Sequence, residues 1–262
     1  MQLDYIGLQA QLPVVNPAPP QQIMSFEPGL TLHWQLDGEV DTRKNVDVYG
    51  IDLFDHIESG KFVEIKELAG KRLICYFSAG SYEDWREDAA KFPADTLIEP
   101  LTNWPGEQWV DFRRQEIRDI MAARMDLAAA NGCDAVEPDN VDGYLNIQSI
   151  DITPQDQIDY LLWLADYAHS KNLSIGLKNA LDLIEPASLH TVFDWALVET
   201  CYPYRLCNLL QPFINQGKAV FIAEYGRRNL PWKCSDAIEN NFYLVFYNRA
   251  LDGAFRYACL GE

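Results

Sequence analysis

Eight short apolar runs recur along the chain, and most of them are continuous rather than alternating with polar residues. A continuous apolar strand is buried on both faces, as in a parallel sheet that helices cover. Helical periodicity separates some of these runs: one stretch buries Ile117, Ile120 and Met121, and another begins at Thr153, which suits a helix cap. The runs cover residues 30–36, 46–54, 72–77, 134–136, 173–177, 193–198, 219–223 and 242–246.

Eight strands alternating with helices over about 235 residues match the length and rhythm of a single (β/α)8 TIM barrel. A doubly wound sheet would usually show a Gly-rich phosphate turn, and the sequence has none. We therefore predict one (β/α)8 domain over residues 29–262. Residues 1–28 contain five prolines and no sustained periodicity, which predicts an extended lead-in segment that the core does not need.

The length, composition and charge narrow the class of protein and its partners. A chain of 262 residues with 48% hydrophobic content can bury one large core, and no apolar run reaches the ~18 residues that span a bilayer. The net charge of -18 would repel a phosphate backbone and attract a polycation, although an acidic surface can also serve solubility alone. We expect no nucleic-acid partner, no membrane partner and a monomer.

Carboxylates follow several of the apolar runs directly, at Asp37, Glu137, Asp139, Glu199 and Glu224. In a (β/α)8 barrel these strand ends surround one cavity, so at least four acids would converge there. Each acid alone could instead cap the following helix. Gathering like charges costs free energy, which a fold carries mainly for chemistry. Two carboxylates flanked by aromatic residues suit glycoside hydrolysis, in which one protonates the leaving oxygen and the other attacks the sugar or activates water.

Several longer motifs carry a family resemblance. They are CYFSAGSYEDWR at 75–86, WPGEQW at 104–109, GCDAVEPDNVDGY at 132–144, GLKNA at 176–180 and ETC at 199–201. The chain resembles glycoside hydrolase family 114, the endo-α-1,4-polygalactosaminidase-like family, over most of residues 34–224. The resemblance implies a (β/α)8 barrel that is secreted, uses no metal or cofactor, and cleaves α-1,4-linked galactosamine-rich polysaccharide with endo action.

The same resemblance implies roles for individual residues. Asp139 and Glu199 match the proposed catalytic pair of the family, and the spacing of Cys201 and Cys207 matches a pair that bridges a loop. The chain departs from the family beside these residues, with Thr200 where Gln is common and Leu206 where Glu is common. Candidate substrate-binding residues from strand-end position, aromatic character or the motifs are Asp37, Tyr76, Trp104, Glu137, Asn140, Lys178 and Glu224.

Alternatives stay open for three of these candidates. Glu137 suits either a hydrogen bond to a sugar hydroxyl or the orientation of Asp139. Lys178 would lower the pKa of a nearby carboxylate, or form a structural ion pair. Trp104, like Trp34, could stack on a sugar ring or fill the core. The chain as a whole could also be a non-catalytic carbohydrate-binding barrel for cationic amino-sugar polymers.

The six cysteines show no C-x-x-C spacing, which gives no support to a zinc or redox site. We expect Cys75 and Cys133, inside apolar runs, to be buried thiols, and Cys234 and Cys259, near turns, to be able to pair. The N-terminus lacks the basic and apolar regions of a signal peptide. The protein is then either cytosolic or a processed form, and the family resemblance favours a secreted protein whose signal peptide has been removed.

Overall fold

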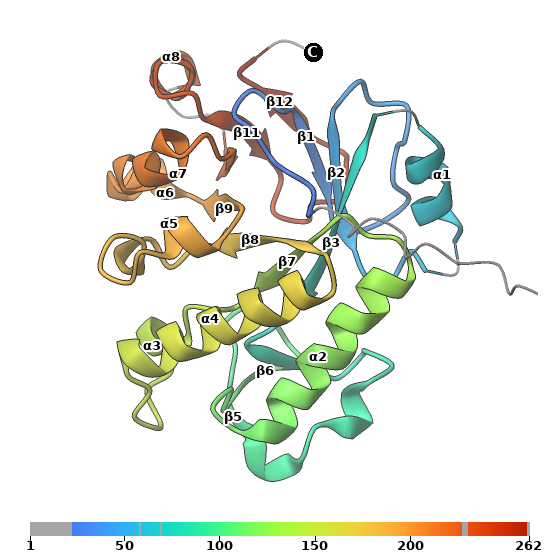
Figure 1. The fold of residues 1–262 in the computed structure, drawn as a ribbon, viewed down its shortest axis with the longest axis vertical. Coiled ribbons are helices and arrows are strands. Elements are labelled where there is room, and N and C mark those ends of the chain that lie inside the picture. The colour runs from blue at the N-terminus through green and yellow to red at the C-terminus, as the bar shows by residue number, and fades with distance from the viewer. Residues whose placement is uncertain (1–22, 58, 69, 227–229, 261–262) are drawn as a thin grey trace, which may run out of the picture.

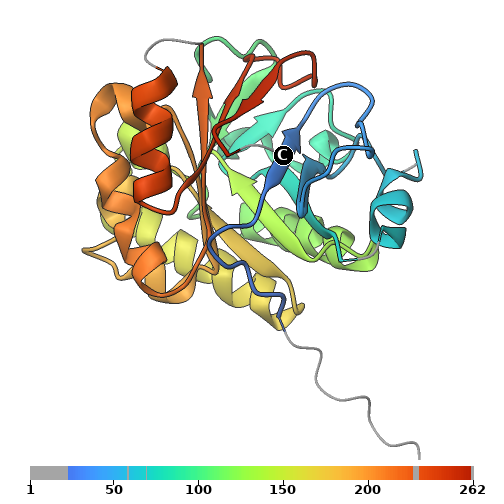
Figure 2. The same ribbon diagram turned by 90° about the horizontal axis from the view of Figure 1, so that it is seen from above.

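The computed structural model describes residues 23–57, 59–68, 70–226 and 230–260. Its centre is a strongly curled nine-stranded sheet in the order β1-β2-β3-β7-β8-β9-β10-β11-β12 (Figures 1 and 2). Neighbours are parallel from β1 to β11, and each of the eight predicted runs contributes one of these strands. They are β1 (Leu32–Gln35), β2 (Val48–Asp52), β3 (Arg72–Ser78), β7 (Ala135–Asp139), β8 (Ser174–Lys178), β9 (Trp195–Glu199), β10 (Val220–Tyr225) and β11 (Tyr243–Tyr247).

The architecture is that of an α/β barrel, but it departs from the strict (β/α)8 alternation that the sequence predicts. The ninth strand β12 (Arg256–Ala258) runs antiparallel to β11. No helix joins β1 to β2, because residues 36–47 are mostly charged and polar and carry no apolar face. After β3 the chain forms a small antiparallel sheet of β4 (Ser81–Glu83), β6 (Glu107–Val110) and β5 (Leu97–Pro100) before it returns to the barrel.

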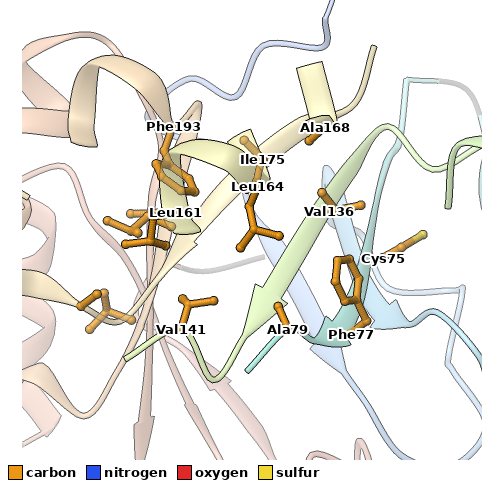
Figure 3. Close-up of a cluster of buried hydrophobic side chains, with 14 of the residues drawn as sticks. Cys75, Phe77, Ala79, Val136, Val141, Leu161, Leu164, Ala168, Ile175 and Phe193 are labelled. Carbon is orange, nitrogen blue, oxygen red and sulfur yellow. The ribbon is translucent and has the colours of Figure 1, made fainter. Parts of the chain in front are cut away.

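Helices cover the outer face of the curled sheet. The two longest are α2 (Gln115–Ala130) and α4 (Pro154–Ser170), and Thr153 caps α4 through a reciprocal pair of hydrogen bonds with Asp156. Figure 3 shows Leu161 and Leu164 of α4 near Ile175 of β8 and Val136 of β7. The remaining helices are α1 (Lys61–Glu67), α3 (Gly143–Asn146), α5 (Leu189–Val192), α6 (Cys201–Tyr204), α7 (Gln211–Asn215) and α8 (Leu230–Glu239), with 3-10 turns η1 (Ala89–Lys91), η2 (Ala94–Thr96), η3 (Leu181–Leu183) and η4 (Cys207–Leu210).

Consecutive side chains of each strand alternate between two separate cores. The outward side chains join the helices in the larger core, and the inward ones fill the interior of the curl. Gly176 belongs to the inward set of β8, where a Cβ atom would lie 2.4 Å from the ring of Trp195. The inward core includes Leu32, Trp34, Val48, Ile74, Ala135, Trp195, Leu197, Phe221, Ala223, Tyr243, Val245 and Tyr247.

The predicted lead-in segment contributes to this inner core. Phe26 is 2% exposed and its ring lies 5.4 Å from that of Trp195, between centroids. The carbonyl oxygen of Phe26 also accepts a hydrogen bond from Ala219 N at 2.7 Å. The core therefore begins before residue 29, which corrects the boundary predicted from the sequence. Residues 1–22 of that segment lie outside the described residues.

The six cysteines form three disulfides: Cys75–Cys133, Cys201–Cys207 and Cys234–Cys259. The expected Cys201–Cys207 bridge is among them, whereas the prediction of buried thiols at Cys75 and Cys133 is wrong. Cys75 points outward from β3 and lies close to the turn that precedes β7, with 6.0 Å between the two Cα atoms. Disulfides of this number are typical of proteins from oxidising compartments. Across the described residues, no helix combines the length and apolar character needed to cross a membrane.

Candidate active site

Polar side chains collect at the carboxyl ends of six strands, and all of them share the inward phase of the curl. Two positions earlier on the same strands, apolar residues such as Ala135, Leu197 and Ala223 fill the interior. We call the polar set the lysine-centred cluster. Its members are Trp34 (β1), Tyr76 (β3), Glu137 and Asp139 (β7), Lys178 (β8), Glu199 (β9) and Tyr225 (β10).

Lys178 is buried at the centre of this cluster. Its Nζ lies 2.9 Å from Glu137 Oε1, 3.2 Å from Asp139 Oδ1 and 3.4 Å from Glu199 Oε2. The same nitrogen is 4.8 Å from the ring centroid of Trp34, close enough for a cation–π contact. Burial alone would lower the pKa of Lys178, but the three surrounding carboxylates raise it well above its usual value. Lys178 therefore remains a cation that three acids share.

Glu137 is the fully buried acid of the cluster. It accepts hydrogen bonds from Trp34 Nε1 at 2.9 Å and from Lys178 Nζ, and it is 0% exposed. Burial raises the pKa of Glu137 to about 7, against the opposing attraction of Lys178. A carboxylate without solvent access cannot reach a sugar hydroxyl, so this geometry favours the orienting alternative. Trp34, 2% exposed, is a core side chain rather than a stacking platform.

Asp139 and Glu199 are the acids of the cluster that solvent reaches, with side chains 16% and 26% exposed. Asp139 Oδ1 accepts the backbone N–H of Asn140 at 2.8 Å, and Oδ2 accepts the Tyr76 hydroxyl at 3.1 Å. Glu199 Oε1 accepts the Tyr225 hydroxyl. Burial and the neighbouring Glu199 raise the pKa of Tyr225, so this hydroxyl stays protonated and donates.

The turn that follows Asp139 is held by a second buried network. Asn140 adopts a left-handed conformation with φ 57°, and its Nδ2 donates to Ser78 Oγ at 2.9 Å and to Glu107 Oε1 at 3.0 Å. Gly80 allows this packing, because a Cβ atom there would lie 1.7 Å from the Asn140 carbonyl oxygen. Burial raises the pKa of Glu107 to about 7, although the Ser81 hydroxyl donates to it. The Asn140 amide, a predicted substrate contact, is thus engaged with the protein.

Three predicted binding residues lie apart from the cluster. Glu224 points outward from β10, is 1% exposed, and binds Lys233 of α8 and the backbone N–H of Tyr202. The prediction that Glu224 lines the cleft is therefore wrong, because strand alternation turns it toward the helix layer. Asp37 is exposed and bonds the N–H of Gly38. Trp104 is 57% exposed in the turn between β5 and β6.

Sequence reasoning missed Tyr225 and Asn179. Tyr225 continues the inward series that Phe221 and Ala223 begin on β10, but both faces of this strand are apolar, so the sequence carries no signal that selects Tyr225 over Glu224. Asn179 follows Lys178 directly, and its Oδ1 accepts the backbone N–H of Glu199 at 3.0 Å. This bond ties the end of β8 to the end of β9, where the second solvent-exposed acid stands.

A family model for glycoside hydrolase family GH114 matches residues 15–261. The chain belongs to family GH114. Among solved structures, Ega3 of Aspergillus fumigatus in complex with galactosamine is 36% identical to this GH114 chain, covers 91% of it and 98% of its own chain, and superposes with a TM-score of 0.82. Family membership and this relationship make the protein a glycoside hydrolase.

Two more distant structures share the fold of this GH114 chain. The glycoside hydrolase domain of PelA from Pseudomonas aeruginosa is 13% identical, with coverage of 86% of this chain and 96% of its own, and a TM-score of 0.67. The trehalulose synthase MutB from Pseudomonas mesoacidophila MX-45 is 10% identical, with coverage of 79% and 58% and a TM-score of 0.52. No curated protein sequence matches the chain.

Proposed function

We propose that this GH114 enzyme is an endo-acting hydrolase of α-1,4-linked, galactosamine-rich polysaccharide, with Asp139 and Glu199 as its catalytic carboxylates. One observation carries the assignment of the pair. Two acids that solvent reaches, at the carboxyl ends of β7 and β9, contact the same buried ammonium group of Lys178. The galactosamine in the 36% identical Ega3 structure supports an amino sugar as substrate. The α-1,4 linkage and the endo action follow the family resemblance.

The shared ammonium group also bears on stereochemistry. Asp139 Oδ1 and Glu199 Oε2 lie 3.2 and 3.4 Å from the same Lys178 Nζ, so these two oxygens can be separated by no more than the sum of the two distances, about 6.6 Å. Such a close pair suits a retaining glycosidase, in which the two carboxyl groups lie about 5 Å apart, better than an inverting one, in which about 6.5 to 9.5 Å leaves room for a water molecule. We therefore infer a double displacement with net retention.

In this mechanism Asp139 is the nucleophile. Its carboxylate accepts hydrogen bonds from Asn140 N and the Tyr76 hydroxyl, which fix its position, and its ion pair with Lys178 balances its charge. It attacks the anomeric carbon and forms a glycosyl-enzyme ester as the bond to the leaving oxygen breaks. Attack by water at the same carbon then releases the sugar and restores the carboxylate.

Glu199 is the acid and base of the same mechanism. Its side chain is more exposed than that of Asp139, so it can reach the glycosidic oxygen, and the Tyr225 hydroxyl fixes one of its carboxylate oxygens. It gives a proton to the leaving oxygen in the first step and takes one from the attacking water in the second. Lys178 contacts both acids, Glu137 contacts Lys178, and both side chains are buried. Lys178 and Glu137 therefore act as positioning residues.

The test replaces each acid with its amide. Asp139→Asn and Glu199→Gln keep the shape of the side chain, and each should reduce turnover at least ~100-fold while polymer binding survives. Asp166→Asn, on the exposed side of α4, is the matched control. Turnover is measured as reducing ends released from an α-1,4-galactosamine polymer, product sizes report endo action, and proton NMR of the first product reports its anomeric configuration.

Each outcome decides one part of the proposal. Near wild-type turnover in either amide variant would remove that residue from the catalytic pair, and a first product of inverted configuration would contradict the double displacement. Polymer binding without any turnover by the unmodified protein would favour the alternative of a non-catalytic carbohydrate-binding barrel.

A further inference from the structure

A second concave site lies on the helix layer, and no residue of the lysine-centred cluster lines it. It has a volume of about 390 Å³ and separates α6 and η4 on one side from α8 on the other. Figure 1 shows α6 and α8 on the same side of the molecule. We call this site the α8 groove. The groove is lined by Tyr202, Arg205, Cys207, Asn208, Trp232, Asp236, Asn240 and Phe242.

One wall of the α8 groove is a single stripe along the helix. Trp232, Asp236 and Asn240 are four residues apart, so they lie on one face at steps of about 6 Å. Trp232 is 58% exposed and meets the ring of Tyr202 edge-on, with 5.7 Å between centroids. This contact positions the indole, and more than half of the side chain remains open to a ligand.

Both walls of the groove are held by covalent and ionic links. The Cys201–Cys207 bridge braces the wall that carries Tyr202, and Cys234–Cys259 braces α8. Between them, Glu224 of β10 binds Lys233 of α8 and the N–H of Tyr202. The site is therefore preformed, as ligand-binding pockets usually are.

The far end of the groove is closed by a hydrogen bond from Gln211 Nε2 to Asn240 Oδ1, at 2.8 Å. The other end of the groove lies toward the lysine-centred cluster, because Tyr202 follows Glu199, at the end of β9, by three residues. Helix α8 begins after the carboxyl end of β10 and runs back toward the start of β11, so Trp232 is nearer than Asn240 to the carboxyl ends of the strands. A polymer leaving the active site could thus continue from Trp232 along the stripe.

The lining groups match an amino sugar. An exposed indole packs on the apolar face of a sugar ring, the Asp236 carboxylate suits an ammonium group, and the amide of Asn208 suits a hydroxyl group. The amide of Asn240 is held by Gln211 and by the Asp236 carbonyl oxygen, so it shapes the groove. Arg205, held exposed in a left-handed conformation with φ 60°, can donate to the carbonyl of an acetamide group. Together, one carboxylate and one guanidinium fit a chain that is partly acetylated and partly cationic.

We propose that the α8 groove is a second binding site for partly N-acetylated amino-sugar polymer, which retains the polymer beside the active site between cuts. The identity of the polymer rests on the proposed function, whereas the site itself rests on the groove. The chain's net charge of -18 further favours a polymer with cationic units over an anionic one.

The experiment measures polymer binding in the inactive Glu199→Gln background, with partly N-acetylated α-1,4-galactosamine polymer as the probe. Trp232→Ala should weaken binding about five- to tenfold, the effect of losing one aromatic contact. Asp236→Asn should weaken binding and reduce its dependence on salt. Ile238→Ala is the matched control, since Ile238 is 46% exposed on α8 but does not line the groove. Thermal unfolding of each variant verifies that it is folded.

Hydrolysis of short α-1,4-galactosamine oligomers by the unmodified protein is measured in parallel, so that the two proposals can fail separately. If the oligomers are cleaved but Trp232→Ala and Asp236→Asn bind polymer as tightly as Ile238→Ala does, the groove proposal is overturned and the hydrolase proposal stands. If no oligomer is cleaved while Trp232→Ala still weakens polymer binding, the groove proposal stands and the hydrolase proposal fails. Binding of polygalacturonate, but not of the amino-sugar polymer, through Arg205 also overturns the groove proposal.

Discussion

Replacing Lys178 with methionine should destabilise the protein in a way that depends on pH. Methionine keeps much of the length of the lysine side chain but removes the ammonium group that lies 2.9 Å from Glu137 Oε1. Glu137 is 0% exposed, so the variant leaves a carboxylate buried without a counter-ion. Removing one partner of a buried ion pair costs about 3 to 5 kcal/mol of unfolding free energy. We expect this full cost only where Glu137 must be ionised.

The pH window follows from the pKa of Glu137. Burial raises that pKa to about 7 in the folded protein, above its unfolded value of about 4.5. A folded-state pKa above the unfolded one means that stability is fully present below pH 4.5 and is lost as pH rises through 7. Without Lys178 the pKa of Glu137 rises further, so at alkaline pH the folded protein must bury either an unpaired carboxylate or a proton bound against the solution pH, and its stability falls. The loss caused by Lys178→Met should therefore be larger at pH 8 than at pH 5.

A double-mutant cycle isolates this interaction. Lys178→Met combined with Glu137→Gln removes both charges, so it should recover most of the stability that Lys178→Met loses at pH 8. Turnover should stay low in the double variant, because Asp139 and Glu199 still lack their shared ammonium group. The free energy of unfolding in urea is measured at pH 5 and pH 8 for all four proteins. Equal losses at both pH values, or a coupling energy below about 0.5 kcal/mol, would refute the assigned ion pair.

Three further results are expected from the structure and the proposed function. Raising salt to ~1 M shortens the Debye length to roughly 3 Å, so the KM for a deacetylated polymer should rise, and a KM independent of salt would contradict electrostatic attraction of a polycation. Tyr225→Phe removes the hydroxyl that donates to Glu199 and should lower kcat/KM about tenfold or more with little change in Tm; unaltered kcat/KM would show that this bond does not position the acid. Cys75→Ser opens a bridge spanning 58 residues and should cost about 4 kcal/mol, against about 2 kcal/mol for Cys201→Ser, whose bridge spans 6, and urea unfolding with the reverse order would contradict the loop-entropy argument.

The positions of the eight parallel strands could be predicted from the sequence because each one is a short, continuous apolar run. The same reasoning overestimated the regularity of the barrel, since it assumed a helix between every pair of strands. Residues 36–47 are too polar to pack a helix on the sheet. The Cys75–Cys133 bridge was missed because it depends on the register between β3 and β7, which no property of either run specifies alone.

The acids of the site could be placed at the strand ends from the sequence, but their direction could not. Strands that are apolar on both faces give no signal about which residues point inward. Structure assigns Glu137, Asp139 and Glu199 to the interior, and it turns Glu224 to the helix layer, where Lys233 neutralises it.

The position of Lys178 explains why the acids of β7 and β9 point inward. A lysine that is 1% exposed can remain charged only if carboxylates surround it, so the inward phase of Lys178 on β8 requires acids of the same phase on the strands beside it. Those strands are β7 and β9, which carry Glu137 and Asp139 on one side and Glu199 on the other. Glu224 stands one strand further away on β10 and has its own cation. The buried lysine at the end of an apolar strand therefore separates the three acids of the cluster from the structural Glu224, and solvent access then separates the proposed pair, Asp139 and Glu199, from the buried Glu137.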